Sequence, residues 1–120
     1  MDFDDAFADF SRAIDLEPTR ASYWYYRALA RLTRGDVRGY RGECASMLQQ
    51  FGQAEDAGEV HWVAWTCALA PDAVTDYSGV VALAKRAVES EPKTISYLNA
   101  SGAILYRAGR LEEAIDQLAK

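Results

Sequence analysis

The sequence is poor in the residue types that usually carry metal binding or catalysis. Its 120 residues contain one histidine, His61, and two cysteines, Cys44 and Cys67. On a helix, the neighbours of His61 at i+3 and i+4 are Ala64 and Trp65, which are neither ligands nor nucleophiles. The chain has no CxxC, HExxH or GxxxxGK[ST] motif, which argues against a zinc site and a phosphate loop. We therefore predict no metal, no cofactor and no enzymatic activity.

Long apolar runs and a basic N-terminus are also missing. No stretch approaches the ~18 apolar residues that would span a bilayer. The start, "MDFDDAFADF", is acidic, so we expect no signal peptide. A net charge of −5 makes the domain a poor candidate for nucleic acid. Two cysteines are too few for a disulfide framework, and buried thiols in a reducing compartment fit better. We expect a cytoplasmic protein that binds neither nucleic acid nor membrane.

What the sequence does contain is a series of helix-sized segments. Hydrophobic residues make up 50% of the chain and recur at helical spacing, and Gly or Pro ends most segments. Asp36, Asp76 and Thr94 are predicted helix caps. The pattern predicts an all-α fold of about seven helices and no strand. The predicted helical segments are 4–18, 21–36, 37–52, 59–71, 76–92, 94–110 and 111–120.

Several of these segments resemble one another. "AIDLEP", ending at Pro18, resembles "AVESEP", ending at Pro92, and the offset of 92 − 18 = 74 residues is roughly two 34-residue periods plus a short insertion. "LTRGDV" also matches "YRAGRL". Helical hairpins that repeat at this period indicate a solenoid.

Particular residues connect these hairpins to a known family. In "LNASGAILYRAGRLEEAIDQL", Gly102 stands at a small-residue position of a first helix, Gly109 at the turn, and Ala114 at a small-residue position of the second helix. "WYYRALARLTRGDV" places Trp24 and Ala28 in matching positions. Further matches lie at Ala6, Phe10, Ala13, Pro18, Ala87 and Pro92. The chain thus resembles the tetratricopeptide repeat family over nearly its whole length.

The resemblance implies one domain, a right-handed α-solenoid of antiparallel helix hairpins. Its parts would be a half-repeat (1–18), a repeat (19–52), a divergent repeat (53–92) and a truncated repeat (93–120). Tyr40 stands where the family has a small residue, and the loop "GQAEDAGE" and the extra "DAVT" depart from its pattern. In wording, "VAWTCALAPDAV" also resembles repeat arrays of bacterial signalling proteins such as serine/threonine kinases.

Four aromatic residues in a row, "YWYY" at 23–26, circle the predicted helix, because successive helical residues point about 100° apart. A first helix of a solenoid is surrounded by neighbours, which explains such a run. We expect Trp24 to pack inside its hairpin and Tyr23 to lean on the preceding helix. Tyr26 would face the following repeat, and Tyr25 would point into the groove.

The resemblance also implies the function: binding of a protein or peptide on the concave face formed by first helices. Aromatic and apolar residues in this groove would favour a segment with hydrophobic anchors. From the family pattern we expect these binding residues: Tyr25, Leu29, Val63, Asn99, Ala103, Tyr106 and Arg107. The same pattern adds flanking groove positions at Ser22, Thr33, Val60, Cys67 and Ser96.

Arginine offers a second candidate surface. Arg27, Arg31 and Arg34 lie at i, i+4 and i+7 and so form one stripe. One interpretation is exposed ion pairs with acids of the preceding helix, each worth about 0–1 kcal/mol. Those acids are Asp2, Asp4, Asp5, Asp9 and Asp15. The alternative is a basic patch for an acidic or phosphorylated partner.

Two other functions stay open beside the binding module. One is a structural role, in which terminal half-repeats self-associate or stack on further repeats through an apolar face such as Phe3, Phe7 and Phe10. The other is an accessory arm of a bacterial signalling kinase.

Overall fold

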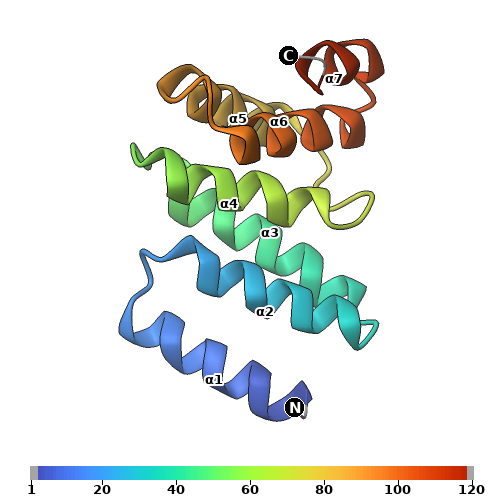
Figure 1. Cartoon of the computed structure of the whole chain (residues 1–120). Coiled ribbons are helices and arrows are strands. Elements are labelled where there is room, and N and C mark those ends of the chain that lie inside the picture. Colours follow the sequence, from blue (N-terminus) through green and yellow to red (C-terminus); the bar gives the residue numbers. More distant parts are fainter. Residues whose placement is uncertain (1–2, 119–120) are drawn as a thin grey trace.

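The computed structural model describes residues 3–118 and shows seven helices and no strand in that part of the chain (Figure 1). This confirms the all-α, repeat-like fold expected from the spacing of apolar residues. None of the described helices is long and apolar enough to cross a bilayer. The helices are α1 (Phe3–Leu16), α2 (Ala21–Thr33), α3 (Val37–Phe51), α4 (Ala57–Ala68), α5 (Ser78–Ser90), α6 (Ile95–Arg107) and α7 (Leu111–Leu118).

Three helices, α3, α4 and α5, begin beside an aspartate side chain that accepts from a backbone N–H of the first turn. The Asp36 carboxylate accepts a hydrogen bond from the Gly39 N–H at 2.8 Å, and this bond holds the pKa of Asp36 below its usual range. Asp56 caps α4, and Asp76 accepts from the Ser78 N–H at 2.9 Å. Thr94 occupies the expected position before α6, but its side chain makes no capping bond.

Two glycines turn the chain between the helices of a hairpin. Gly35 follows α2 with φ of 84°, and Gly109 follows α6 with φ of 80°. Both lie in the left-handed region, which glycine adopts without steric cost. The first and last hairpin turns therefore form where the sequence pattern places them.

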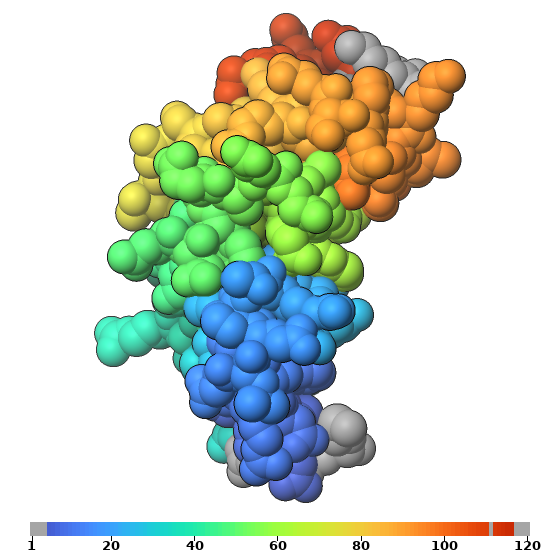
Figure 2. Space-filling view, turned by 90° about the vertical axis from the view of Figure 1, so that its left-hand side faces the viewer, coloured from blue at the N-terminus to red at the C-terminus, as the bar shows by residue number. Residues whose placement is uncertain are grey.

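The helices stack in chain order into an elongated molecule with extents of 40 × 26 × 24 Å (Figures 1 and 2). Helices α2, α4 and α6 contact one another in succession, and we call them the inner helices. Each inner helix also packs on the helices immediately before and after it in the chain. Sequence-adjacent hairpins thus form one continuous stack.

The core is built from small residues at helix crossings and from one large exception. Ala28, Ala64 and Gly102 are buried on the three inner helices. Tyr40 on α3 is fully buried, and its hydroxyl donates to the Thr66 carbonyl at 2.6 Å and accepts from the Ala70 N–H at 3.2 Å. The large side chain that departs from the repeat pattern therefore connects α3 to the end of α4.

Candidate partner-binding face

The inner helices leave one side uncovered. Half-buried and exposed residues follow each of them at helical spacing, away from the neighbouring helices. Charged residues lie on the same helix faces: the half-buried Glu59 precedes Trp62 by three residues, and the half-buried Arg107 follows Ala103 by four. We call this surface the inner-helix face and define it by Ser22, Tyr25, Tyr26, Leu29, Thr33, Trp62, Trp65, Ser96, Asn99, Ala103 and Tyr106.

Aromatic rings from two inner helices meet on this face. The ring centroids of Tyr25 and Trp62 lie 4.9 Å apart, and those of Tyr26 and Trp62 lie 6.1 Å apart. Tyr26 also stacks on Phe10 of α1, with centroids at 5.5 Å and ring planes 19° apart. We call Tyr25, Tyr26 and Trp62 the α2/α4 cluster. Such ring pairs add about 0.5–1.5 kcal/mol beyond the buried area.

A second group of rings lies between α4 and α6. The His61 ring centroid is 5.0 Å from that of Tyr97 and 6.4 Å from that of Trp65. We call these three residues the α4/α6 cluster. The 5.1 Å distance between the His61 and Trp62 centroids connects the two clusters. Together with Phe10 they form one run of rings from α1 to α6, named here the aromatic ladder.

His61 is the most buried member of the ladder. It is 8% exposed, and its Nδ1 atom is buried without a hydrogen-bond partner among the described residues. Burial disfavours the charged imidazolium and lowers the pKa of His61 below its usual 6.5. The neutral form of the ring is therefore favoured. Carboxylates lie beside the other end of the ladder, where burial and the neighbouring Glu91 raise the pKa of Tyr97.

The "YWYY" run is arranged partly as expected. Trp24 lies inside its hairpin, edge-on to Phe51 at 6.1 Å, and its indole N–H donates to the Pro18 carbonyl at 3.1 Å. Tyr25 faces α4. Tyr26 touches the following inner helix, as expected, and also stacks on Phe10 of the preceding helix, a contact that was expected of Tyr23. Sequence spacing gives positions around a helix but not the direction from which a neighbour approaches.

The expected contribution of α4 is wrong. Val63 is fully buried, as are Val60 and Cys67, so none of them offers atoms to a partner. Trp62 and Trp65 reach the surface instead. Because α4 is apolar on nearly every side, its periodicity does not reveal which stripe remains uncovered.

On α6 the expected residues lie near the surface. Asn99 is exposed, Ala103 is half-buried, and Tyr106 is 61% exposed. The Nε of Arg107 donates to the Ala68 carbonyl at 3.0 Å, so this side chain joins α6 to the end of α4. A pocket of about 310 Å³ lies beside these residues and is closed on its other side by α7.

Two members of the arginine stripe, Arg27 and Arg31, form ion pairs inside the molecule. Arg27 holds the Glu43 carboxylate with two bonds, Nε to Oε1 at 2.6 Å and Nη2 to Oε2 at 3.1 Å. The Nε of Arg31 shares Oε1 at 2.9 Å, and its Nη1 reaches Asp36 at 3.0 Å. The Glu43 side chain is 3% exposed. These internal pairs favour a structural role for Arg27 and Arg31, and binding of an acidic partner there stays a prediction.

The partners of these arginines also differ from the acids expected on the preceding helix. From α1 they meet an aromatic ring and a hydroxyl: Arg31 lies over the Phe7 ring at 4.6 Å, and Arg27 contacts the Ser11 Oγ at 3.3 Å. Asp2 and the side chain of Asp4 lie outside the described residues. Arg34, the third member of the stripe, is exposed.

The position of Glu43 in the sequence indicates a buried ion pair. It lies three residues after Tyr40 and four before Met47, on the apolar stripe that buries α3. An acid at such a position needs a buried cation, because an unpaired charge is strongly disfavoured in a core. Arg27 and Arg31, four residues apart on the preceding helix, meet that requirement.

The two thiols are buried and free, as expected. Both are fully buried, one on α3 and one on α4, and the Cys44 Sγ lies 3.9 Å from the Thr66 carbonyl oxygen. Hydrogen bonding between the thiols lowers the pKa of Cys44 and raises that of Cys67.

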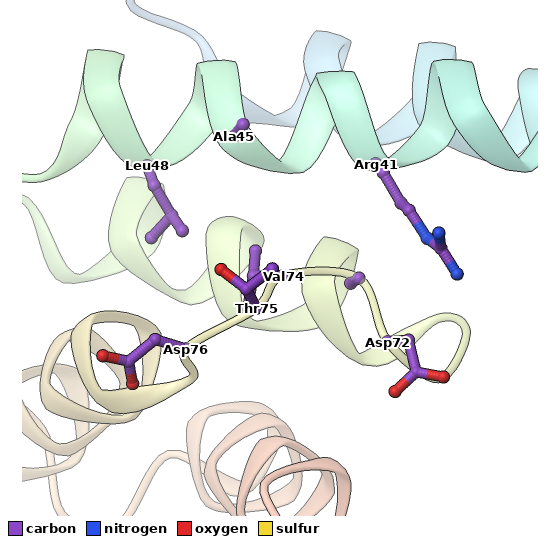
Figure 3. Close-up of a pocket in the computed structure, with 8 residues that line it drawn as sticks. Arg41, Ala45, Leu48, Asp72, Val74, Thr75 and Asp76 are labelled. Carbon is purple, nitrogen blue, oxygen red and sulfur yellow. The ribbon is translucent and has the colours of Figure 1, made fainter.

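An open cleft lies elsewhere, between α3 and the loop that follows α4 (Figure 3). Its volume is about 820 Å³. In Figure 3, Leu48 and Arg41 extend from α3 toward the loop that carries Asp72 to Asp76. The lining residues include no histidine or cysteine, and they form no nucleophile–base pair. The cleft therefore offers no recognisable catalytic arrangement.

No protein-family model matches the chain, and no curated protein is detectably similar to it in sequence. Functional inference therefore depends on the geometry of the described residues.

Proposed function

We propose that the chain is a non-catalytic interaction module of tetratricopeptide type, which binds a protein or peptide segment along the inner-helix face. The observation that carries the proposal is the aromatic ladder, which runs across α2, α4 and α6 and is only partly covered. Aromatic residues are enriched at protein interfaces. The inner-helix face has this property.

The remainder of the molecule supports this role as a rigid frame. The Arg27–Glu43–Arg31 network and the Tyr40 hydroxyl fasten α3 to α2 and α4 from the outer side. A face held in this way loses little conformational freedom when a partner binds, which favours affinity. The proposal places the module in the cytoplasm, consistent with its two free thiols.

A comparison of captured proteins tests the proposal. Wild type and a Tyr25→Ala/Asn99→Ala variant would be used to capture partners from a lysate of the source cells, with Gln49→Ala on exposed α3 as the matched control. Circular dichroism would first establish equal helicity. We expect a protein bound by wild type and Gln49→Ala and lost from the double variant. Equal capture by all three, or capture by none, would contradict the proposal.

Self-association is the second candidate, and the α6/α7 end favours it. Tyr106 and Ile115 are 61% and 57% exposed beside the pocket of about 310 Å³. The corresponding apolar face of α1 is partly open, as expected, because Phe7 lies under Arg31 and Phe10 stacks on Tyr26 while both stay half-buried. The side chain of Phe3 is outside the described residues. Light scattering over a range of concentrations tests this candidate, and a strictly monomeric chain would remove it.

A further inference from the structure

Two buried thiols lie in contact where α3 meets α4. Cys44 and Cys67 are both fully buried, and their side chains are hydrogen-bonded to each other. The Cys44 Sγ also lies 3.9 Å from the carbonyl oxygen of Thr66, the residue that precedes Cys67 in the chain. The sequence contains no other cysteine. The only two sulfhydryl groups of the protein are therefore held side by side, on different helices.

This contact has the arrangement from which a disulfide can form. A disulfide requires two sulfur atoms about 2 Å apart on side chains that point toward each other. Thiols that share a hydrogen bond already point toward each other, so only a short further approach of the sulfur atoms is needed. A bond between Cys44 and Cys67 would connect α3 to the end of α4 covalently.

The two thiols differ in reactivity. The thiolate, and not the thiol, is the form that attacks a disulfide. The hydrogen bond from Cys67 favours the charged form of Cys44 and lowers its pKa, and the same contact raises the pKa of Cys67. Cys44 is therefore suited to attack first, and Cys67 to complete the bond.

A route from solvent toward Cys44 lies on the outer side of the stack. The cleft of about 820 Å³ is lined from α3 by Arg41, Ala45 and Leu48 (Figure 3). Arg41 precedes Cys44 by three residues and Leu48 follows it by four, so the three share one helix face. The opposite wall is the loop after α4, which begins two residues beyond Cys67. Movement of this loop away from α3 would open a path from the cleft to the thiols.

We propose that Cys44 and Cys67 form a redox-sensitive site, which a low-molecular-weight disulfide oxidises to an intramolecular disulfide that locks α3 to α4. The Cys44 thiolate attacks one sulfur of the small disulfide, forms a mixed disulfide and releases a small thiolate, which takes up the proton that Cys44 lost. The Cys67 sulfur then loses its proton, attacks the Cys44 sulfur and displaces the second small thiol. In total the protein loses two protons and two electrons, and the small disulfide gains them as two thiols.

The disulfide should make the stack more resistant to unfolding. It restricts the unfolded chain between residues 44 and 67, which is the usual source of disulfide stabilisation. It also lies beside the Tyr40 hydroxyl, which already joins α3 to the end of α4, so it reinforces an existing connection. We expect the Tm to rise by about 5–15 °C.

The probe is hydroxyethyl disulfide, a small uncharged disulfide. The reduced full chain would be incubated with an excess of it overnight, and remaining thiols labelled with N-ethylmaleimide after denaturation. Intact mass spectrometry should show a monomer that has lost two hydrogen atoms and carries no label. Cleavage after Glu55 and Glu59 separates the two cysteines, so a linked peptide pair identifies the bond. Circular dichroism should show unchanged helicity and the higher Tm, and dithiothreitol should reverse the change.

Single-cysteine variants are the matched controls. Cys44→Ala and Cys67→Ala each keep one thiol and should show no rise in Tm with the probe. A substitution in the core can itself lower stability, so each variant is compared with its own untreated form. If a variant does not fold, the reduced, oxidised and re-reduced forms of wild type still decide the question.

Three results would overturn the inference. One is a wild-type chain that keeps two thiols able to react with the label. Another is a product that consists only of mixed disulfides or disulfide-linked dimers. The third is an oxidised monomer whose Tm is unchanged or lower, because the bond would then not fit the folded stack. None of these results bears on the inner-helix face, so the redox site and the proposed function can fail independently.

Discussion

At the scale of single residues, two buried polar side chains, Glu43 and His61, should influence stability: Glu43 through its ion pairs and His61 through its response to pH. The Glu43 carboxylate forms ion pairs with Arg27 and Arg31. The buried Nδ1 atom of His61 has no hydrogen-bond partner among the described residues. The sequence identified Arg27 and Arg31 as a stripe but gave them the wrong partners, because periodicity shows which residues share a face and not what packs on it. Their partner follows from the position of Glu43 on an apolar stripe.

Glu43→Gln should lower the free energy of unfolding by about 3 kcal/mol, because two guanidinium groups lose their shared carboxylate. The value lies at the low end for a buried pair because the side chains of Arg27 and Arg31 keep 18% and 25% of their exposure. Urea denaturation followed by circular dichroism measures the change. Glu113→Gln, which breaks an exposed pair with Arg110, is the control and should change stability by about 0–1 kcal/mol. Equal effects of the two substitutions would refute the buried network.

His61 should make stability depend on pH. Its folded-state pKa is lowered by burial, so the unfolded chain binds the proton more readily than the folded chain. Its contribution is therefore fully present above the unfolded value of 6.5 and is lost as pH falls through the window below it. The Tm of wild type should fall between pH 7 and about 5 by more than the Tm of His61→Phe, since titrating carboxylates affect both proteins alike. Parallel Tm curves for the two proteins would show that His61 is not desolvated.

At the scale of elements, the sequence predicted the helices. It also predicted the exposed faces of α2 and α6, but not that of α4. On α2 and α6 the polar and apolar residues alternate at helical spacing, so Tyr25, Leu29, Asn99 and Tyr106 are placed near the surface as expected. On α4 the apolar residues continue around the helix, so the pattern could not separate Val63, which is buried, from Trp62, which is not. Only the packing of α2, α3, α5 and α6 around α4 decides between them.

Tyr40 tests how α3 and α4 are joined. Tyr40→Phe removes the bond to the Thr66 carbonyl and the one from the Ala70 N–H while keeping the ring. We expect stability to fall by about 1–3 kcal/mol, because the Ala70 N–H loses its acceptor and the Thr66 carbonyl loses one of its donors. Urea denaturation measures this, with Tyr106→Phe at a 61% exposed position as the control, for which little change is expected. A Tyr40→Phe variant as stable as wild type would show that the hydroxyl does not fasten the two helices.

At the scale of the whole molecule, the stack is a one-dimensional series in which each helix depends on its neighbours. The sequence repeats predicted this arrangement, because hairpins with recurring small residues and glycine turns cannot bury their apolar faces alone. The continuous run of rings across α2, α4 and α6 could not be predicted from the sequence. It joins residues 10 to 97, and its geometry depends on how successive hairpins are rotated against each other.

The stack should open from its ends. Helix α1 packs chiefly on α2 and α7 chiefly on α6, whereas α4 packs on α2, α3, α5 and α6. Hydrogen–deuterium exchange read by mass spectrometry should therefore show the fastest exchange in the helical amides of α1 and α7 and the slowest in α4. Uniform protection along the chain would indicate a single cooperative unit instead.

Whether a partner lies on the inner-helix face can be tested directly by site-specific crosslinking. A photoreactive amino acid would replace Asn99, which is exposed on α6, or Gln49, which is exposed on the outer helix α3. Each protein would be irradiated in a lysate of the source cells, and crosslinked polypeptides identified by mass spectrometry. An interaction module that uses the inner-helix face should give a discrete crosslinked protein from position 99 and none from position 49. Crosslinks from position 49 alone, or the same products from both positions, would contradict it.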